Sequence, residues 1–146
     1  MVSRSARERF AAARVARLAT ASAAAVPHLV PVVFALENDY IALAVDAKPK
    51  TTTRLRRLDN IAATGRVSLL VDAYDEDWSQ LWWVRVDGVA DIVAAEQPSG
   101  TAAIDALVAK YPQYAHARPA GPAIIVRDLR WRAWEFTPHP GDRDAE

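Results

Sequence analysis

The part of this sequence richest in chemically useful side chains is a basic stretch between residues 48 and 66. Six of its residues are lysine or arginine, and Asp59 is its single acid. Three consecutive threonines, residues 51–53, precede a pattern that predicts a helix opening at Thr51 and ending at Gly65. Lysine charge, threonine hydroxyls and the free N–H groups of a helix N-terminus together suit a bound phosphate.

A structural role for the same residues is the alternative. Charge runs commonly form a solvated helix face, and a threonine can simply cap the helix. β-Branched threonines are poor helix formers, which favours a role for them as hydrogen-bond donors to a ligand. Both interpretations stay open on the residues alone.

Other kinds of site are excluded or unsupported by the sequence. The chain has no cysteine, which excludes disulfides, thiolate nucleophiles and cysteine-ligated metals. Its histidines, His28, His116 and His139, are far apart, so we predict no metal site. The five glycines are too scattered for a glycine-rich phosphate loop or a Gly-x-Ser-x-Gly turn. No catalytic side chain can be named.

Length and composition predict one globular domain. The chain has 146 residues, 51% of them hydrophobic, and a formal net charge of zero. We expect a single domain over residues 1–146 with a flexible tail at 137–146. The charge balance argues against nucleic acid as a partner. The absence of a long apolar segment argues against a membrane, and the charged N-terminus argues for a cytoplasmic protein.

Alternating apolar and polar residues predict about six strands, mostly joined by hairpins. They cover residues 15–20, 26–36, 40–47, 66–73, 81–93 and 123–136, with further helices at 4–14 and 99–111. We therefore predict a mainly β (α+β) fold, a small antiparallel barrel with short helices in its connections. Pro27 and Pro31 predict that strand 26–36 is an edge strand, bulged near Pro31.

Five tryptophans form a second signal. Trp82 lies on the apolar face of strand 81–93 and is predicted to be core. Trp78 follows the acidic loop 72–77, and Trp83 shares a strand face with Arg85. We expect each of these two to pack in the core or in a subunit interface, with covering a ring-shaped ligand as the alternative.

Three segments together resemble a known family. They are Lys-Pro-Lys-Thr-Thr-Thr-Arg-Leu-Arg-Arg-Leu at 48–58, Asp-Glu-Asp-Trp-Ser at 75–79 and Trp-Trp-Val-Arg-Val-Asp-Gly at 82–88. The chain resembles the pyridoxamine-5′-phosphate-oxidase-like split β-barrel flavoproteins over most of its length. Within them it is most similar to the actinobacterial deazaflavin-dependent members, which use coenzyme F420. The resemblance implies an FMN-binding-like split barrel and a homodimer with two cofactor sites at the subunit interface.

The resemblance also assigns residues to the phosphate end of the cofactor. It implies that Lys50, Thr51, Thr52 and Thr53 hold the phosphate and that Arg54 contacts the acidic tail of the coenzyme. These positions coincide with the basic stretch that the residues alone single out.

The remaining implied contacts lie along two strands. His28, Val30 and Pro31 are expected to run beside the cofactor ring, with backbone groups of their strand meeting its edge. Asp46 and Lys48 are expected near the linker between ring and phosphate.

The implied activity is hydride transfer between the deazaflavin and a small electron-poor substrate, with Trp78 closing the pocket from the other subunit. An FMN-dependent enzyme on the same barrel is one alternative, and the basic residues 54–57 favour the coenzyme with the polyanionic tail. A non-catalytic carrier of flavin, deazaflavin or haem is another alternative. Nucleic-acid binding through the basic helix is opposed by the zero net charge.

Overall fold

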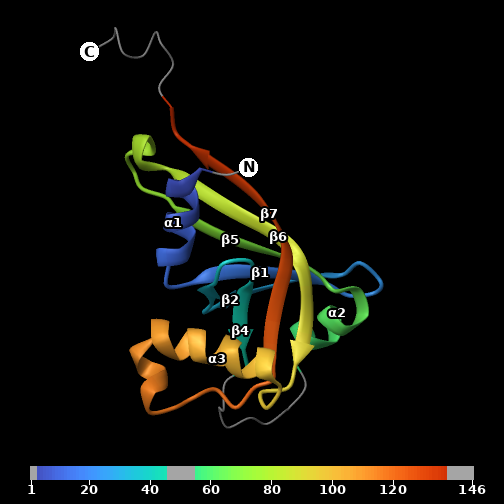
Figure 1. Cartoon of the computed structure of the whole chain (residues 1–146). Coiled ribbons are helices and arrows are strands. Elements are labelled where there is room, and N and C mark those ends of the chain that lie inside the picture. Colours follow the sequence, from blue (N-terminus) through green and yellow to red (C-terminus); the bar gives the residue numbers. More distant parts are fainter. Residues whose placement is uncertain (1–2, 46–54, 138–146) are drawn as a thin grey trace, which may run out of the picture.

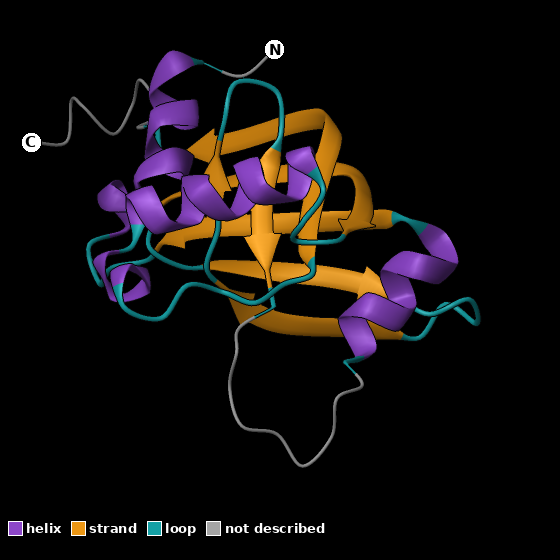
Figure 2. Ribbon diagram, turned by 60° about the horizontal axis from the view of Figure 1, so that its bottom comes forward, coloured by secondary structure: helices purple, strands orange, loops and turns teal. Residues whose placement is uncertain are grey.

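The computed structural model describes residues 3–45 and 55–137 and shows one curled antiparallel sheet with three α-helices (Figures 1 and 2). In chain order the elements are α1 Arg4–Ala12, β1 Ala16–Ala21, β2 Pro27–Val32, β3 Ala35–Leu36, β4 Ile41–Ala44, α2 Arg56–Thr64, β5 Arg66–Ala73, the 3₁₀ turn η1 Trp78–Gln80, β6 Trp82–Val93, α3 Pro98–Lys110, the 3₁₀ turn η2 Pro112–Ala115 and β7 Ala123–Glu135. The predicted antiparallel split barrel with short connecting helices is confirmed.

The order of strands in the sheet is β2-β1-β5-β6-β7-β4-β3. β2 and β3 therefore lie at opposite edges of the sheet, although only Val33 and Phe34 separate them along the chain. Two residues span at most about 7 Å, so the sheet must curl until its two edges approach each other. This short link makes the seven strands a half-barrel instead of an open sheet.

The main core fills the inside of the curled sheet. Every long strand contributes apolar side chains to it, and α1 and α2 add Phe10 and Ile61. A second core lies on the other side of β3, β4 and β7, where α3 packs with Ile104 and Leu107. Both faces of β4 are consequently covered, which explains its burial on successive residues.

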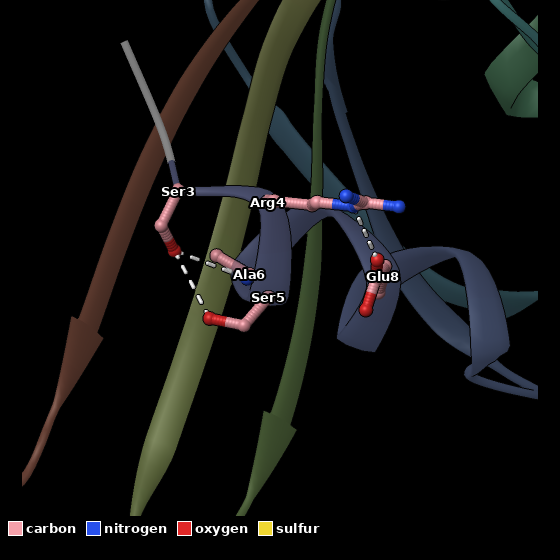
Figure 3. A network of polar contacts seen from close by, with 5 residues as sticks. All are labelled: Ser3, Arg4, Ser5, Ala6 and Glu8. Carbon is pink, nitrogen blue, oxygen red and sulfur yellow. Dashed lines mark hydrogen bonds and ion pairs between the residues drawn. The ribbon is translucent and has the colours of Figure 1, made fainter.

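α1 begins with a side-chain cap. The Ser3 hydroxyl accepts a hydrogen bond from the Ala6 N–H at 3.2 Å and lies 3.2 Å from the Ser5 hydroxyl (Figure 3). One turn later Arg4 and Glu8 form an exposed ion pair, as spacing of four residues allows. The cap orients the helix so that Phe10 enters the core, where it is completely buried.

Phe34 is held in place from three sides. The centroid of the Phe34 ring lies 4.8 Å from that of the Phe10 ring. The Lys110 ammonium lies 3.8 Å from the centroid of the Phe34 ring. Its backbone N–H donates to the Tyr111 hydroxyl, which lies 3.0 Å from the carbonyl oxygens of Phe34 and Arg14. The end of α3 thus clamps the link between β2 and β3.

The sheet bends where β6 meets β7. Asp87 pairs with Arg130 and Val89 with Arg127, so β7 carries one extra residue opposite Gly88. Asp128 supplies the bulge with a left-handed backbone, φ 55°. A Cβ atom on Gly88 would lie 2.6 Å from Val126 Cγ1, so this crossing requires glycine.

Two sequence predictions about the strands need correction. Strand 26–36 is two strands, because the chain crosses between sheet edges at Val33 and Phe34. β2 is an edge strand, as its prolines predicted, but its pairing with β1 continues through Pro31 without a bulge. The interruption falls later, where the link has to turn. The third predicted strand is also shorter, ending at Ala44.

We expect Gly88→Ala to lower the free energy of unfolding by about 1–3 kcal/mol, the usual cost of overpacking. The new methyl group would meet Val126 Cγ1 at 2.6 Å and the Arg127 carbonyl oxygen at 2.8 Å. Urea denaturation followed by circular dichroism measures the change. Val89→Ala, at an exposed neighbouring position, is the control and should change stability little. Equal stability of Gly88→Ala and the native protein would contradict the bulge geometry.

We also expect stability to rise with pH above neutrality because of Lys110. Burial, with a smaller effect of the Arg14 guanidinium, lowers the pKa of Lys110 to about 8 from its ordinary 10.5. Between these values the unfolded chain binds the proton more tightly, so unfolding becomes harder as pH rises. Burial raises the pKa of Tyr111, whose opposite effect begins only above its ordinary value of 10.

Urea denaturation of the native protein and of Lys110→Met, at steps between about pH 7 and about pH 9.5, tests this linkage. The native protein should gain stability relative to the variant across that interval. A stability difference that is independent of pH would contradict the lowered pKa.

Candidate functional site

A groove at the edge of the sheet, here called the β2 groove, has a volume of about 450 Å³. Its walls come from β2, the end of β4, η2 and the start of α2. Most of the described side chains that line it are apolar, and Arg57 is the charged one among them. The lining residues are Val15, Val30, Pro31, Val32, Val33, Leu43, Ala44, Arg57, Tyr114 and Ile124.

Arg57 lies in the first turn of α2. Within residues 3–45 and 55–137 its guanidinium makes no hydrogen bond or ion pair. The positive charge is half-buried beside apolar walls, where an anionic group would compensate it. The groove therefore combines an apolar slot with one cation at its end.

The start of α2 differs from the sequence prediction. The helix begins at Arg56, and Leu55 is its N-cap residue with extended angles (φ −111°, ψ 131°) and no side-chain cap. α2 thus begins later than the predicted opening, and Thr51 itself lies outside the described residues. The predicted end is confirmed, because Gly65 closes the helix with φ 72° and donates to the Ile61 carbonyl.

α2 is fixed to the sheet by a buried hydrogen bond. The Asn60 side-chain amide donates to the Thr20 hydroxyl of β1 at 2.9 Å, and both side chains are buried. His28 faces Thr20 across the β1–β2 pair. Its Nδ1 atom is buried and has no hydrogen-bond partner among the residues that the structure describes. The hydrogen bond between Asn60 and Thr20 sets where α2, and with it Arg57, lies relative to β2.

The structure brings together some of the predicted site residues. Val30 and Pro31 both line the β2 groove, as expected of a strand that runs beside a ring. His28 lies on the same strand but does not line the groove. Trp78 lies in η1 at the other end of the sheet and is 71% exposed. The other predicted residues, Asp46, Lys48, Lys50, Thr51, Thr52, Thr53 and Arg54, lie outside the described residues.

The prolines of β2 determine which backbone groups face its free edge. Alternate residues of an antiparallel strand direct their N–H and C=O groups to opposite sides. Pro27, Leu29 and Pro31 share one side, and a proline, which lacks an N–H, suits the side turned away from β1. The free edge of β2 thus offers mainly carbonyl oxygens, with the Leu29 N–H as a donor between the prolines.

A second hollow, here called the Trp83 hollow, lies on the outer face of β1, β5 and β6 and has a volume of about 500 Å³. α1 and α2 pack on the inner side and α3 against β3, β4 and β7, so no described helix lines this hollow. The lining residues are Arg17, Ala19, Leu29, Ser68, Leu69, Leu70, Asp72, Tyr74, Trp83 and Arg85. Leu29 is 68% and Tyr74 70% exposed.

The hollow and the groove adjoin each other at one strand pair. Pro31, which lines the β2 groove, is the cross-strand partner of Arg17, which lines the Trp83 hollow. Arg17 in turn lies opposite Leu70, and Leu70 lies opposite Arg85. A continuous row on the sheet therefore leads from the groove into the hollow.

An acidic hairpin tip lies beyond the hollow, between β5 and β6. Figure 1 shows it at the opposite end of the molecule from α3. Hydrogen bonds from the hydroxyl and backbone N–H of Ser79 lower the pKa of Asp77. The tip exposes the aromatic side chains of Tyr74 and Trp78 beside its acids. Aromatic residues are enriched in protein interfaces, whereas aspartate and glutamate are depleted there.

Metal and membrane features can be assessed for the described part of the chain. Residues 3–45 and 55–137 contain no group of three histidines, aspartates or glutamates placed to hold a metal ion. Over the same ranges, no helix is long and apolar enough to span a bilayer.

Comparison with known proteins defines the class to which this fold and groove belong. The model of the pyridoxamine 5′-phosphate oxidase family matches residues 3–137. The chain belongs to the pyridoxamine 5′-phosphate oxidase family. The family resemblance carried by the three sequence segments is confirmed. No curated protein sequence matches the chain.

Several solved structures share the fold. A FAD-binding protein from Mesorhizobium loti has 18% identity and a TM-score of 0.69, with 94% of this chain and 96% of that one covered. An F420 reductase has 20% identity and a TM-score of 0.64, with 90% and 98% covered. A haem-binding protein from Mycobacterium smegmatis has 22% identity and a TM-score of 0.64, with 90% and 56% covered. At these identities the similarity establishes the fold.

Sequence reasoning missed part of the site. Arg57 appeared only as one of several basic residues, and Tyr114 gave no signal at all. Arg17 was also missed, because a lone arginine in an alternating strand looks like any exposed residue. The alternation of apolar and polar residues could have placed Arg17 and Arg85 on the same outward face, but not next to each other.

Proposed function

We propose that this protein is a coenzyme F420-binding oxidoreductase that acts on a small electron-poor organic substrate. The observation that carries the proposal is the β2 groove, which sets an apolar slot beside Arg57, whose guanidinium makes no hydrogen bond or ion pair to another described residue. Family membership supports a flavin-type cofactor. When bound, the deazaflavin supplies the redox chemistry, a hydride exchanged at its C5 carbon.

The residues of the groove fit such a group. Val30, Val32 and Leu43 form apolar walls that hold a planar ring and exclude water from it. Arg57 offers a charge to the phosphate or acidic tail, in line with the sequence-based roles of Lys50 and Arg54. The carbonyl-rich edge of β2 suits ring N–H donors. No acid or base is assigned, so the protein contributes position and electrostatic field.

FMN on the same barrel is the nearest alternative, since both cofactors carry a phosphate and a tricyclic ring. The basic run from Arg54 to Arg57 favours the cofactor with the longer anionic tail. A haem carrier is the other alternative: among the described residues, the groove and the hollow are lined by no histidine or methionine, and Tyr114 and Tyr74 are the side chains there that could ligate haem iron.

We further propose that the protein is a homodimer. The outer face of β1, β5 and β6 lacks a helical cover and exposes Leu29 and Tyr74 beside Trp83, Arg17 and Arg85. Aromatic residues and arginine are the types enriched in protein interfaces. A second copy on this face would bury these side chains and adjoin the β2 groove. The acidic tip with Trp78 would then lie against the partner.

Titration of the purified protein with F420, followed by tryptophan fluorescence, tests the cofactor. We expect saturable quenching, with tighter binding of F420 than of FMN. Lys50→Ala should weaken F420 binding by about 1.5–3 kcal/mol, and Arg57→Gln should also weaken it, because each removes a charged hydrogen bond to an anion.

Arg130→Gln is the control, since Arg130 is an exposed arginine of β7 that lies outside the basic run and does not line the groove. It should leave the affinity for F420 nearly unchanged. Equal or tighter binding of FMN would favour the FMN alternative. Unchanged affinity in both Lys50→Ala and Arg57→Gln would rule out the proposed anion site.

Analytical ultracentrifugation tests the dimer. The native protein should sediment as a dimer, and Leu29→Asp should weaken association about tenfold or more, because it buries a charge at the interface. Val26→Asp, an exposed apolar position in the turn between β1 and β2, should have little effect. A monomeric native protein would contradict the proposed interface.

A further inference from the structure

The Trp83 hollow has the composition of a small-molecule site. Leu29, Leu70, Trp83 and Tyr74 give it apolar and aromatic surface, and its volume of about 500 Å³ is enough for a single aromatic ring with substituents. Indole and phenol rings favour stacked or edge-on contact with a planar ligand. The apolar part of the hollow therefore selects for a flat molecule.

One charge at the hollow, that of Arg17, is open to an anionic ligand. Arg85 is compensated, because its Nε lies 3.2 Å from an Asp87 carboxylate oxygen, which also accepts from the Ser68 hydroxyl at 2.6 Å. Arg17 is not compensated, since it makes no hydrogen bond or ion pair within residues 3–45 and 55–137. Among the described residues that line the hollow, Asp72 is the one acid, and it forms no ion pair with Arg17. The free Arg17 guanidinium presents a planar fork of donors that matches a carboxylate.

We infer that the Trp83 hollow binds a planar aromatic carboxylate, with its ring against Trp83 and its carboxylate on Arg17. The pairing of Arg17 with Pro31 puts this ligand next to the β2 groove. That the ligand is the substrate rests on the proposed function, whereas the binding itself does not. In the proposed homodimer the second copy covers the hollow, so the ligand lies between the two protomers.

Isothermal titration calorimetry with 4-nitrobenzoate and with its uncharged analogue 4-nitrobenzamide tests the inference. The native protein should bind the acid more tightly than the amide. Arg17→Gln should weaken binding of the acid by about tenfold to a hundredfold, the range for a charged hydrogen bond, and leave the amide unaffected. The affinity of Arg17→Lys for the acid should lie between those of the native protein and Arg17→Gln, because lysine keeps the positive charge and lacks the planar pair of guanidinium donors.

Arg132→Gln is the matched control, since Arg132 lies across from Arg85 on the same sheet but does not line the hollow. It should bind the acid as the native protein does. Equal affinity for acid and amide, no effect of Arg17→Gln, or absence of binding would each overturn the inference. F420 titration of the native protein and of the same variants separates the two proposals. A native protein that binds the acid but does not bind F420 would defeat the proposed function and leave this inference standing.

Discussion

The connection between β2 and β3 is the constraint on which the rest of this structure depends. These strands occupy the two edges of a seven-stranded sheet, yet only Val33 and Phe34 join them. A chain of two residues cannot cross the width of an open sheet, whose neighbouring strands lie about 4.8 Å apart. The sheet therefore has to curl, and the completely buried Phe34 fills the position where its edges meet.

Curling divides the molecule into surfaces of different character. The inner face becomes the core, and α3 covers the outer side of β3, β4 and β7. Its last residues, Lys110 and Tyr111, also hold Phe34, so the helix closes the barrel and shields one wall at the same time. The outer face of β1, β5 and β6 receives no such cover. The features proposed for ligand and partner lie on this uncovered side and along its β2 edge.

The position of α2 follows from a different contact. Ile61 enters the core, and Asn60 reaches Thr20 of β1, so the helix lies against the strand next to β2. Arg57, in its first turn, consequently lies in the groove beside Val30 and Pro31. Burying the Asn60 amide costs little free energy, because the amide is hydrogen-bonded. Removing the amide would leave the Thr20 hydroxyl buried without this partner and α2 without its polar contact to β1.

Much of the fold follows from local pattern. The twofold alternation of β6, the exact span Arg66–Ala73 of β5 and the glycine end of α2 were all visible in the residues, because burial on one face and a left-handed cap leave a signature within a few positions. Pro27 and Pro31 likewise predicted that β2 is an edge strand. The division of residues 26–36 into strands at opposite sheet edges left no such trace, because it depends on how the whole sheet closes.

The candidate site divides in the same way. The residue types alone pointed to a basic, threonine-rich segment suited to a phosphate, because residue type and spacing are properties of the chain itself. The position of Val30 and Pro31 beside a ring was implied by the family resemblance. Tertiary structure decided that Arg57 reaches the groove and that the groove adjoins the hollow. It also decided that Arg17 lines the hollow with Trp83 and has no ion-pair partner among the described residues. Each relation joins residues from different strands or helices, and only strand register and helix packing set their separation.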